Sequence, residues 1–162
     1  MRKILLILLL ILFAAPSPCF ARAINSGPHS AGNTLWTGTG DACEANNAGD
    51  PITQFDHLAN RWMMSQFALP SYPDGPFYQC MAISKTADPT GEWYLYTFKT
   101  SDTLMNDYPH FGVWSDGYYM TVNQFGEEPT CTPSGWCGAG VAVFERDAML
   151  QGLPARLIYI DT

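Results

Sequence analysis

Positive charge is scarce in this chain of 162 residues, which has eight Lys and Arg against 15 Asp and Glu. Three of the basic residues lie near the N-terminal apolar segment, Arg2 and Lys3 directly before it and Arg22 shortly after it. The rest of the chain keeps five basic residues against 15 carboxylates, a net charge of −10. Nucleic-acid binding proteins neutralise phosphates with Lys and Arg, so this balance argues against nucleic acid as a partner.

Several enzyme motifs are also missing. The sequence contains no G-x-S-x-G, no H-E-x-x-H, no phosphate loop and no G-x-G-x-x-G. None of the three His residues has a second His or an acidic residue at ligand spacing. These absences exclude the serine hydrolase, metalloprotease and nucleotide-binding classes that such motifs define, and we expect neither a cofactor nor a metal.

No apolar run is long enough for a membrane span, which needs about 20 residues. The run ILLILLLILFAA at residues 4–15 is shorter, follows two basic residues and precedes Pro and small residues, which is the pattern of a signal peptide. Small residues allow cleavage after Ala21 or Ala23. We therefore predict a signal peptide over residues 1–23 and a secreted protein, extracellular or periplasmic, without membrane attachment after cleavage.

Cleavage would remove Cys19 and leave an even number of cysteines, which in an exported chain indicates disulfides. Four cysteines allow three pairings. Cys131 and Cys137 flank the turn-forming stretch TPSGW, so they could close a small loop and leave Cys43 to pair with Cys80. The spacing lacks the paired C-x2-C of structural zinc sites, which disfavours the rival zinc interpretation.

The composition and hydrophobic pattern of the chain change at Asp50. Residues 24–49 are rich in Gly, Asn, Ser and Thr without apolar periodicity, and predict a flexible leader. Beyond them lie short apolar and aromatic runs of strand length, separated by Asp, Asn, Pro and Gly. The predicted strands are ITQFD, RWMMSQFAL, FYQCMAIS, WYLYTFKT, FGVW, GYYMTVNQF, GAGVAVFE and ARLIYI. Only FERDAMLQG suggests a helical turn, so the fold class predicted is all-β and antiparallel.

An internal repeat suggests how these strands are grouped. MSQF at 64–67 is echoed by VNQF at 122–125, and each ends a strand–turn–strand unit that contains Asp in its turn. Units of about 60 residues with three or four strands are typical of β-propeller blades. We expect one blade over 50–105 and a partial blade over 106–162, hence a fragment of a larger propeller. The alternative is a self-contained β-sandwich of about eight strands.

Four stretches carry a resemblance to a known family. They are CEANNAGDPITQFDHLANRWMMSQFAL, QCMAISKTADPTGEWYLYTF, NDYPHFGVWSDGYYMTVNQF and GAGVAVFERDAMLQG. Together they resemble large secreted bacterial proteins, mostly uncharacterised, whose repeats are predicted to form β-propellers. The resemblance spans residues 41–162 and implies a propeller fold in an exported protein that extends beyond this length. It implies no particular activity.

A more remote likeness concerns five-bladed glycosidases of the arabinanase type, which open successive blades with an Asp. Asp50, followed by Pro51, and Asp107 have a similar layout. The likeness implies that Asp50 is the general base and that Asp107 tunes the pKa of the acid. The Glu that acts as acid in those enzymes has no counterpart here. The alternative is that both Asp residues bond backbone N–H groups in turns.

A ring exposed on a loop could bind sugar by stacking. Trp136 lies between Cys131 and Cys137 among Gly and Pro, and is the best candidate. The function expected is therefore an extracellular or cell-surface propeller-type module, non-catalytic, whose partner is a carbohydrate or another cell-surface ligand. The alternative is a glycoside hydrolase of the five-bladed class or a remnant of one.

Overall fold

The chain is all-β, as predicted. A computed structural model describes residues 22–23, 31–127, 129 and 131–161, which form two antiparallel sheets. The N-terminal sheet has the order β1-β5-β4-β3-β2. Its strands are β1 (Arg22–Ala23), β2 (Gly49–Asp56), β3 (Arg61–Ala68), β4 (Phe77–Ser84) and β5 (Glu92–Ser101).

The C-terminal sheet has the order β6-β7-β8-β9, so β2–β5 and β6–β9 are both up-and-down meanders. Its elements are β6 (Met105–Val113), β7 (Tyr118–Phe125), β8 (Trp136–Phe144), helix α2 (Arg146–Gln151) and β9 (Leu157–Asp161). All eight predicted strands are present and the helical turn is α2. Strand β6 begins before the predicted FGVW because Met105 and Asn106 pair with Phe125 and Gln124.

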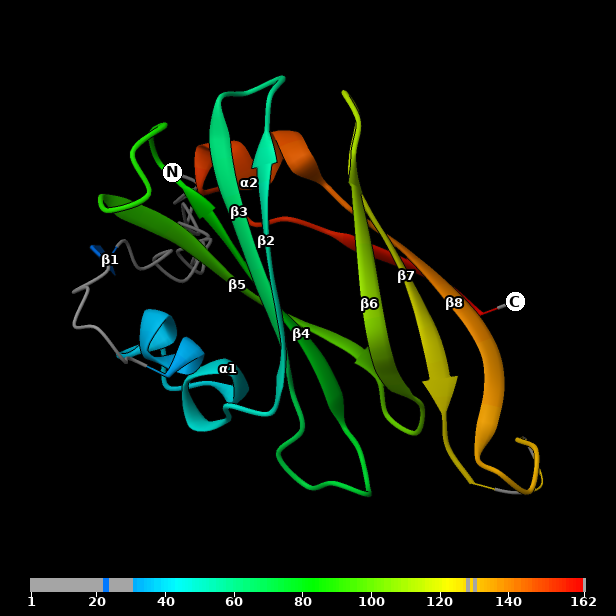
Figure 1. The fold of residues 1–162 in the computed structure, drawn as a ribbon. Coiled ribbons are helices and arrows are strands. Elements are labelled where there is room, and N and C mark those ends of the chain that lie inside the picture. The colour runs from blue at the N-terminus through cyan, green and yellow to red at the C-terminus, as the bar shows by residue number, and fades with distance from the viewer. Residues whose placement is uncertain (1–21, 24–30, 128, 130, 162) are drawn as a thin grey trace, which may run out of the picture.

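The two sheets stack face to face, and β2 and β6 run side by side in the same direction (Figure 1). Alternate residues of each strand point to opposite faces of a sheet, which is why every second side chain enters the shared core. Met63, Met81 and Phe98 from one sheet meet Met120 and Phe144 from the other. The rings of Phe98 and Phe144 lie 4.9 Å apart.

The opposite face of the N-terminal sheet is covered by the 3-10 helix η1 (Gly32–Trp36) and the helix α1 (Ala42–Ala45). The composition of residues 24–49 predicts a flexible leader. The described part of that range instead buries Leu35, Trp36 and Cys43 against the sheet. The cause is tertiary, since such short helices need packing for their stability.

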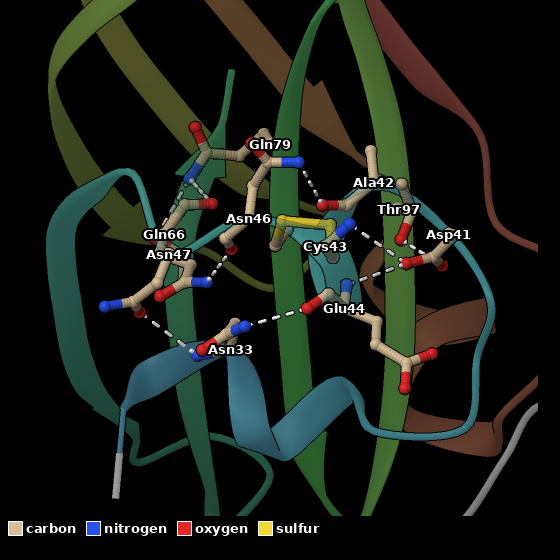
Figure 2. The surroundings of a disulfide bond; sticks show 12 residues. Asn33, Asp41, Ala42, Cys43, Glu44, Asn46, Asn47, Gln66, Gln79 and Thr97 are labelled. Atoms are coloured by element: carbon tan, nitrogen blue, oxygen red, sulfur yellow. Dashed lines mark hydrogen bonds between the residues drawn. A yellow bond between two sulfur atoms is a disulfide. The ribbon is translucent and has the colours of Figure 1, made fainter. Parts of the chain in front are cut away.

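Side-chain bonds fix this cover in place (Figure 2). The Asp41 carboxylate accepts hydrogen bonds from the backbone N–H groups of Cys43 and Glu44, which caps α1. Its second oxygen accepts from the Thr97 hydroxyl of β5 at 2.6 Å. A disulfide joins Cys43 to Cys80 of β4 and another joins Cys131 to Cys137, so the predicted pairs are present.

The first strands of the two sheets share a bulge. In β2 the register shifts between Gly49 and Ile52, and in β6 it shifts between Asp107 and His110. Asp50 and Tyr108 lie inside these bulges with φ of 46° and 52°, and each precedes a proline. Asp50 and Tyr108 are 58 positions apart, so the two sheets share this backbone feature. The Gln-Phe pairs are also 58 positions apart but differ in register, since Gly49 pairs with Phe67 whereas Asp107 pairs with Asn123. Assignment of the sheets to propeller blades, or to the alternative sandwich, stays a prediction.

Candidate functional site: an acidic cavity at one end of the sheets

Three loops from both sheets enclose a cavity of about 960 Å³. They are the β3–β4, β5–β6 and β7–β8 connections, which lie together at the lower end in Figure 1. A meander brings alternate turns to the same end of a sheet, and stacking two meanders in the same direction brings both sets of turns together. Residues more than 60 positions apart, such as Tyr72 and Ser134, thus line one space.

The lining combines carboxylates with apolar and aromatic side chains. Its carboxylates are Asp74, Asp102, Asp107 and Glu127, and its apolar members are Tyr72, Pro73, Leu104, Met105 and Phe125. Asp102 is paired with Lys99, whose ammonium lies 2.9 Å from the carboxylate. The other carboxylates leave the cavity acidic.

Local bonds hold the loops that form the walls. A side chain at Gly75 would collide with the backbone carbonyl of Asp102, so the β3–β4 and β5–β6 loops approach this closely only with glycine there. The Ser101 hydroxyl accepts bonds from the N–H groups of Thr103 and Leu104. These contacts join the β3–β4 and β5–β6 walls of the cavity.

The β7–β8 loop is held separately. The Gly126 N–H donates to the Gly135 carbonyl at 2.9 Å, and the Cys131–Cys137 disulfide closes the same loop. Ser134 and Gly135 therefore enter the lining from within the disulfide-closed loop, and Gly126, which precedes Glu127, is bonded to that loop through Gly135. Because this disulfide joins cysteines only six positions apart, it restricts the backbone of one wall of the cavity.

The structure separates the residues predicted from sequence. Asp107 lines the cavity, whereas Asp50 lies exposed in the β2 bulge and is not part of the lining. Trp136 begins β8 directly after Gly135 of the lining, and 47% of its side chain is exposed. The cavity thus brings Asp107 and the Trp136 loop to one end of the molecule, without Asp50.

Apart from Asp107, the residues that line the cavity were not predicted from the sequence. Asp74 lies in the connection between the predicted strands RWMMSQFAL and FYQCMAIS, and its N–H donates to the Ser71 carbonyl there. Its place in the cavity follows from loop packing, which has no local sequence signal. The exposed ring of Tyr72 beside it was missed for the same reason.

Among the described residues, no group of three or more His, Cys, Asp or Glu side chains is placed to hold a metal ion. That part of the chain also has no helix long and apolar enough to cross a membrane. Comparisons with protein-family models, curated proteins and solved structures find no match. The chemistry of the cavity is therefore the main guide to function.

Proposed function

We propose that this chain is an exported, disulfide-stapled binding module whose acidic cavity takes a polyhydroxylated ligand, a carbohydrate in solution or on a cell surface. The observation that carries this proposal is the juxtaposition of Tyr72 with the carboxylates of Asp74, Asp107 and Glu127 around one cavity. Carboxylates accept hydrogen bonds from sugar hydroxyls. An exposed aromatic ring offers a flat apolar surface to the C–H face of a sugar.

The cavity also has a suitable size and shape for a small ligand. Ligand pockets are typically concave spaces of roughly 300–1,000 Å³ with apolar walls and a few polar groups. Tyr72 exposes 65% of its surface, so its ring is accessible to a ligand from solvent. Trp136, at the edge of the same loop region, would add a second stacking surface for a longer chain of sugars.

Export is supported by the two disulfides, which are characteristic of oxidising, extracytoplasmic compartments. The signal peptide predicted over 1–23 lies outside the described residues except for Arg22–Ala23. The propeller-type assignment is part of the proposal and is supported by the two meanders and their shared bulge.

Binding without catalysis is the function that we favour over glycoside hydrolysis. Hydrolysis needs two carboxyl groups on either side of the scissile bond, about 5–9.5 Å apart. Asp107 lines the cavity but Asp50, its partner in the hydrolase interpretation, does not. The Glu expected as acid also has no counterpart in the sequence.

The test is calorimetric titration of the purified chain with a panel of neutral, acidic and amino sugars and their oligomers. For the sugar that binds best, we expect Tyr72→Ala and Asp107→Asn each to weaken binding by about tenfold, the effect of losing one good contact. Tyr108→Ala and Asp50→Asn are matched controls, because both residues are exposed and neither lines the cavity. Equal losses in the controls, or no binding to any sugar, would contradict the proposal.

A further inference from the structure

Two rows of side chains cross the N-terminal sheet on the face that contacts the C-terminal sheet. Each row runs from β3 through β4 to β5, with members directly opposite one another in the strand register. The rows are Met63–Ile83–Tyr94 and Ser65–Met81–Tyr96. Met63, Met81 and Ile83 are fully buried, because the C-terminal sheet covers them.

The C-terminal sheet repeats this arrangement on the face turned away from its partner. The corresponding rows run from β7 through β8 to β9 and are Tyr119–Val143–Ile158 and Thr121–Val141–Ile160. The bulges show which rows of the two sheets are equivalent. Ser65 pairs with Ile52, the first paired residue after the β2 bulge, and Thr121 pairs with His110, the first paired residue after the β6 bulge. Both sheets therefore carry apolar rows at the same place on the same face.

The row-bearing faces of the two sheets therefore point the same way, and the two sheets do not pack row-bearing face against row-bearing face. The side-by-side, same-direction course of β2 and β6 agrees with this (Figure 1). In such a stack the row-bearing face of one sheet packs against the face of the next sheet that does not carry the rows. Ile158 and Ile160 on the row-bearing face of the C-terminal sheet are 61% and 52% exposed, so no element within the described residues covers them.

We propose that this outer face of β7–β9 is a docking surface for a further antiparallel four-stranded sheet of the same repeat, seated as the C-terminal sheet is seated on the N-terminal one. The surface continues the pattern of an interface that the chain already forms. Contiguous exposed apolar side chains on a sheet are characteristic of such contact surfaces. Thr121 is the exposed polar member of its row, and the exposed side chains of His110 and Asn123 lie next to it in the sheet.

A second copy of this chain cannot be seated in the same sense as the C-terminal sheet. To do so, a second copy would have to pack through a sheet face that does not carry the rows. In the N-terminal sheet that face is covered by η1 and α1, which the Cys43–Cys80 disulfide holds in place. In the C-terminal sheet it is covered by the N-terminal sheet. The occupant is therefore an additional sheet with that face free, which a head-to-tail pair of identical chains cannot supply.

The experiment uses a tandem chain in which a second copy of residues 102–161 follows Thr162, so that residues 102–104, which join β5 to β6, also precede the added sheet. Ile158→Cys in the first copy reports on the docking surface through its rate of reaction with a thiol reagent. Leu58→Cys, on the exposed β2–β3 turn, is the matched control. Hydrogen exchange follows folding of the added copy.

We expect the added copy to acquire protected amides and the thiol at 158 to react about tenfold more slowly than in the unextended chain, while the thiol at 58 reacts equally in both. Val141→Glu in the first copy should restore the fast reaction at 158 in the tandem chain. An unfolded added copy, or an unchanged rate at 158, would overturn the proposal. So would concentration-dependent protection of 158 in the unextended chain, since the occupant would then be a second copy.

Discussion

Arg146 and Asp56, 90 positions apart in the sequence, form a buried ion pair that joins the end of β2 to the start of α2. The guanidinium donates from Nε to one carboxylate oxygen at 2.8 Å and from a terminal nitrogen to the other at 3.2 Å. The Tyr118 hydroxyl donates to the same carboxylate at 2.9 Å. Asp56 is fully buried and Arg146 nearly so, which makes each charge dependent on the other.

The first prediction concerns loss of this pair. Asp56→Asn removes the negative charge and leaves the buried Arg146 cation with the exposed Asp147 carboxylate, 3.7 Å away, in place of its buried partner. Breaking a buried pair in this way costs about 3–5 kcal/mol of unfolding free energy, to be measured by urea denaturation. Arg156→Ala is the control, because it breaks the exposed pair with Glu145 and should leave the midpoint nearly unchanged. Similar effects of the two substitutions would contradict this assignment.

The second prediction is a loss of stability in acid. Burial raises the pKa of Asp56, but the bonds from Arg146, the Ala59 N–H and Tyr118 outweigh it and hold that pKa below its ordinary value. The folded state therefore binds the Asp56 proton less readily than the unfolded state, whose Asp has a pKa of about 3.9. The stabilisation is complete above pH of about 5 and declines as the pH falls through the folded pKa. Urea midpoints between pH 7 and 3 should show this decline, and Asp56→Asn should make it shallower.

The third prediction separates the two disulfides. Cys43–Cys80 spans 37 residues and Cys131–Cys137 only 6, and a cross-link that closes a longer loop restricts the unfolded chain more. Replacing Cys43 and Cys80 by Ala should lower the unfolding free energy by about 4 kcal/mol, and replacing Cys131 and Cys137 by about 2 kcal/mol. The first replacement should also release η1 and α1, seen as faster amide exchange at Leu35 and Trp36. Unchanged exchange there would show that packing alone holds this cover.

The sequence predicts the parts of this molecule that follow local rules. Alternation and turn residues identify all eight strands, and Asp56 accepts bonds from the Leu58 and Ala59 N–H groups in the predicted turn. The partner of the same Asp56 carboxylate, Arg146, could not be predicted, because the pairing depends on how the two sheets stack. The cavity was missed for that reason too, whereas its member Asp107 was proposed through a family likeness. The helices η1 and α1 have no periodicity of their own and form by contact with the sheet.

The last prediction uses the shared bulge. An L-residue with positive φ is strained by roughly 1–2 kcal/mol, and glycine is not. At Tyr108, with φ of 52°, Gly should therefore be more stable than Ala by about 1 kcal/mol, and both variants lose the same ring contact with His110. At Tyr119, which is not among the positive-φ residues, the order should reverse by about 0.5–1 kcal/mol, because Gly weakens an ordinary strand. The same pair of substitutions at Asp50 should follow the order at Tyr108, since the two bulges are equivalent. If Ala equals Gly at both bulges in urea denaturation, the positive φ assigned to Asp50 and Tyr108 is contradicted.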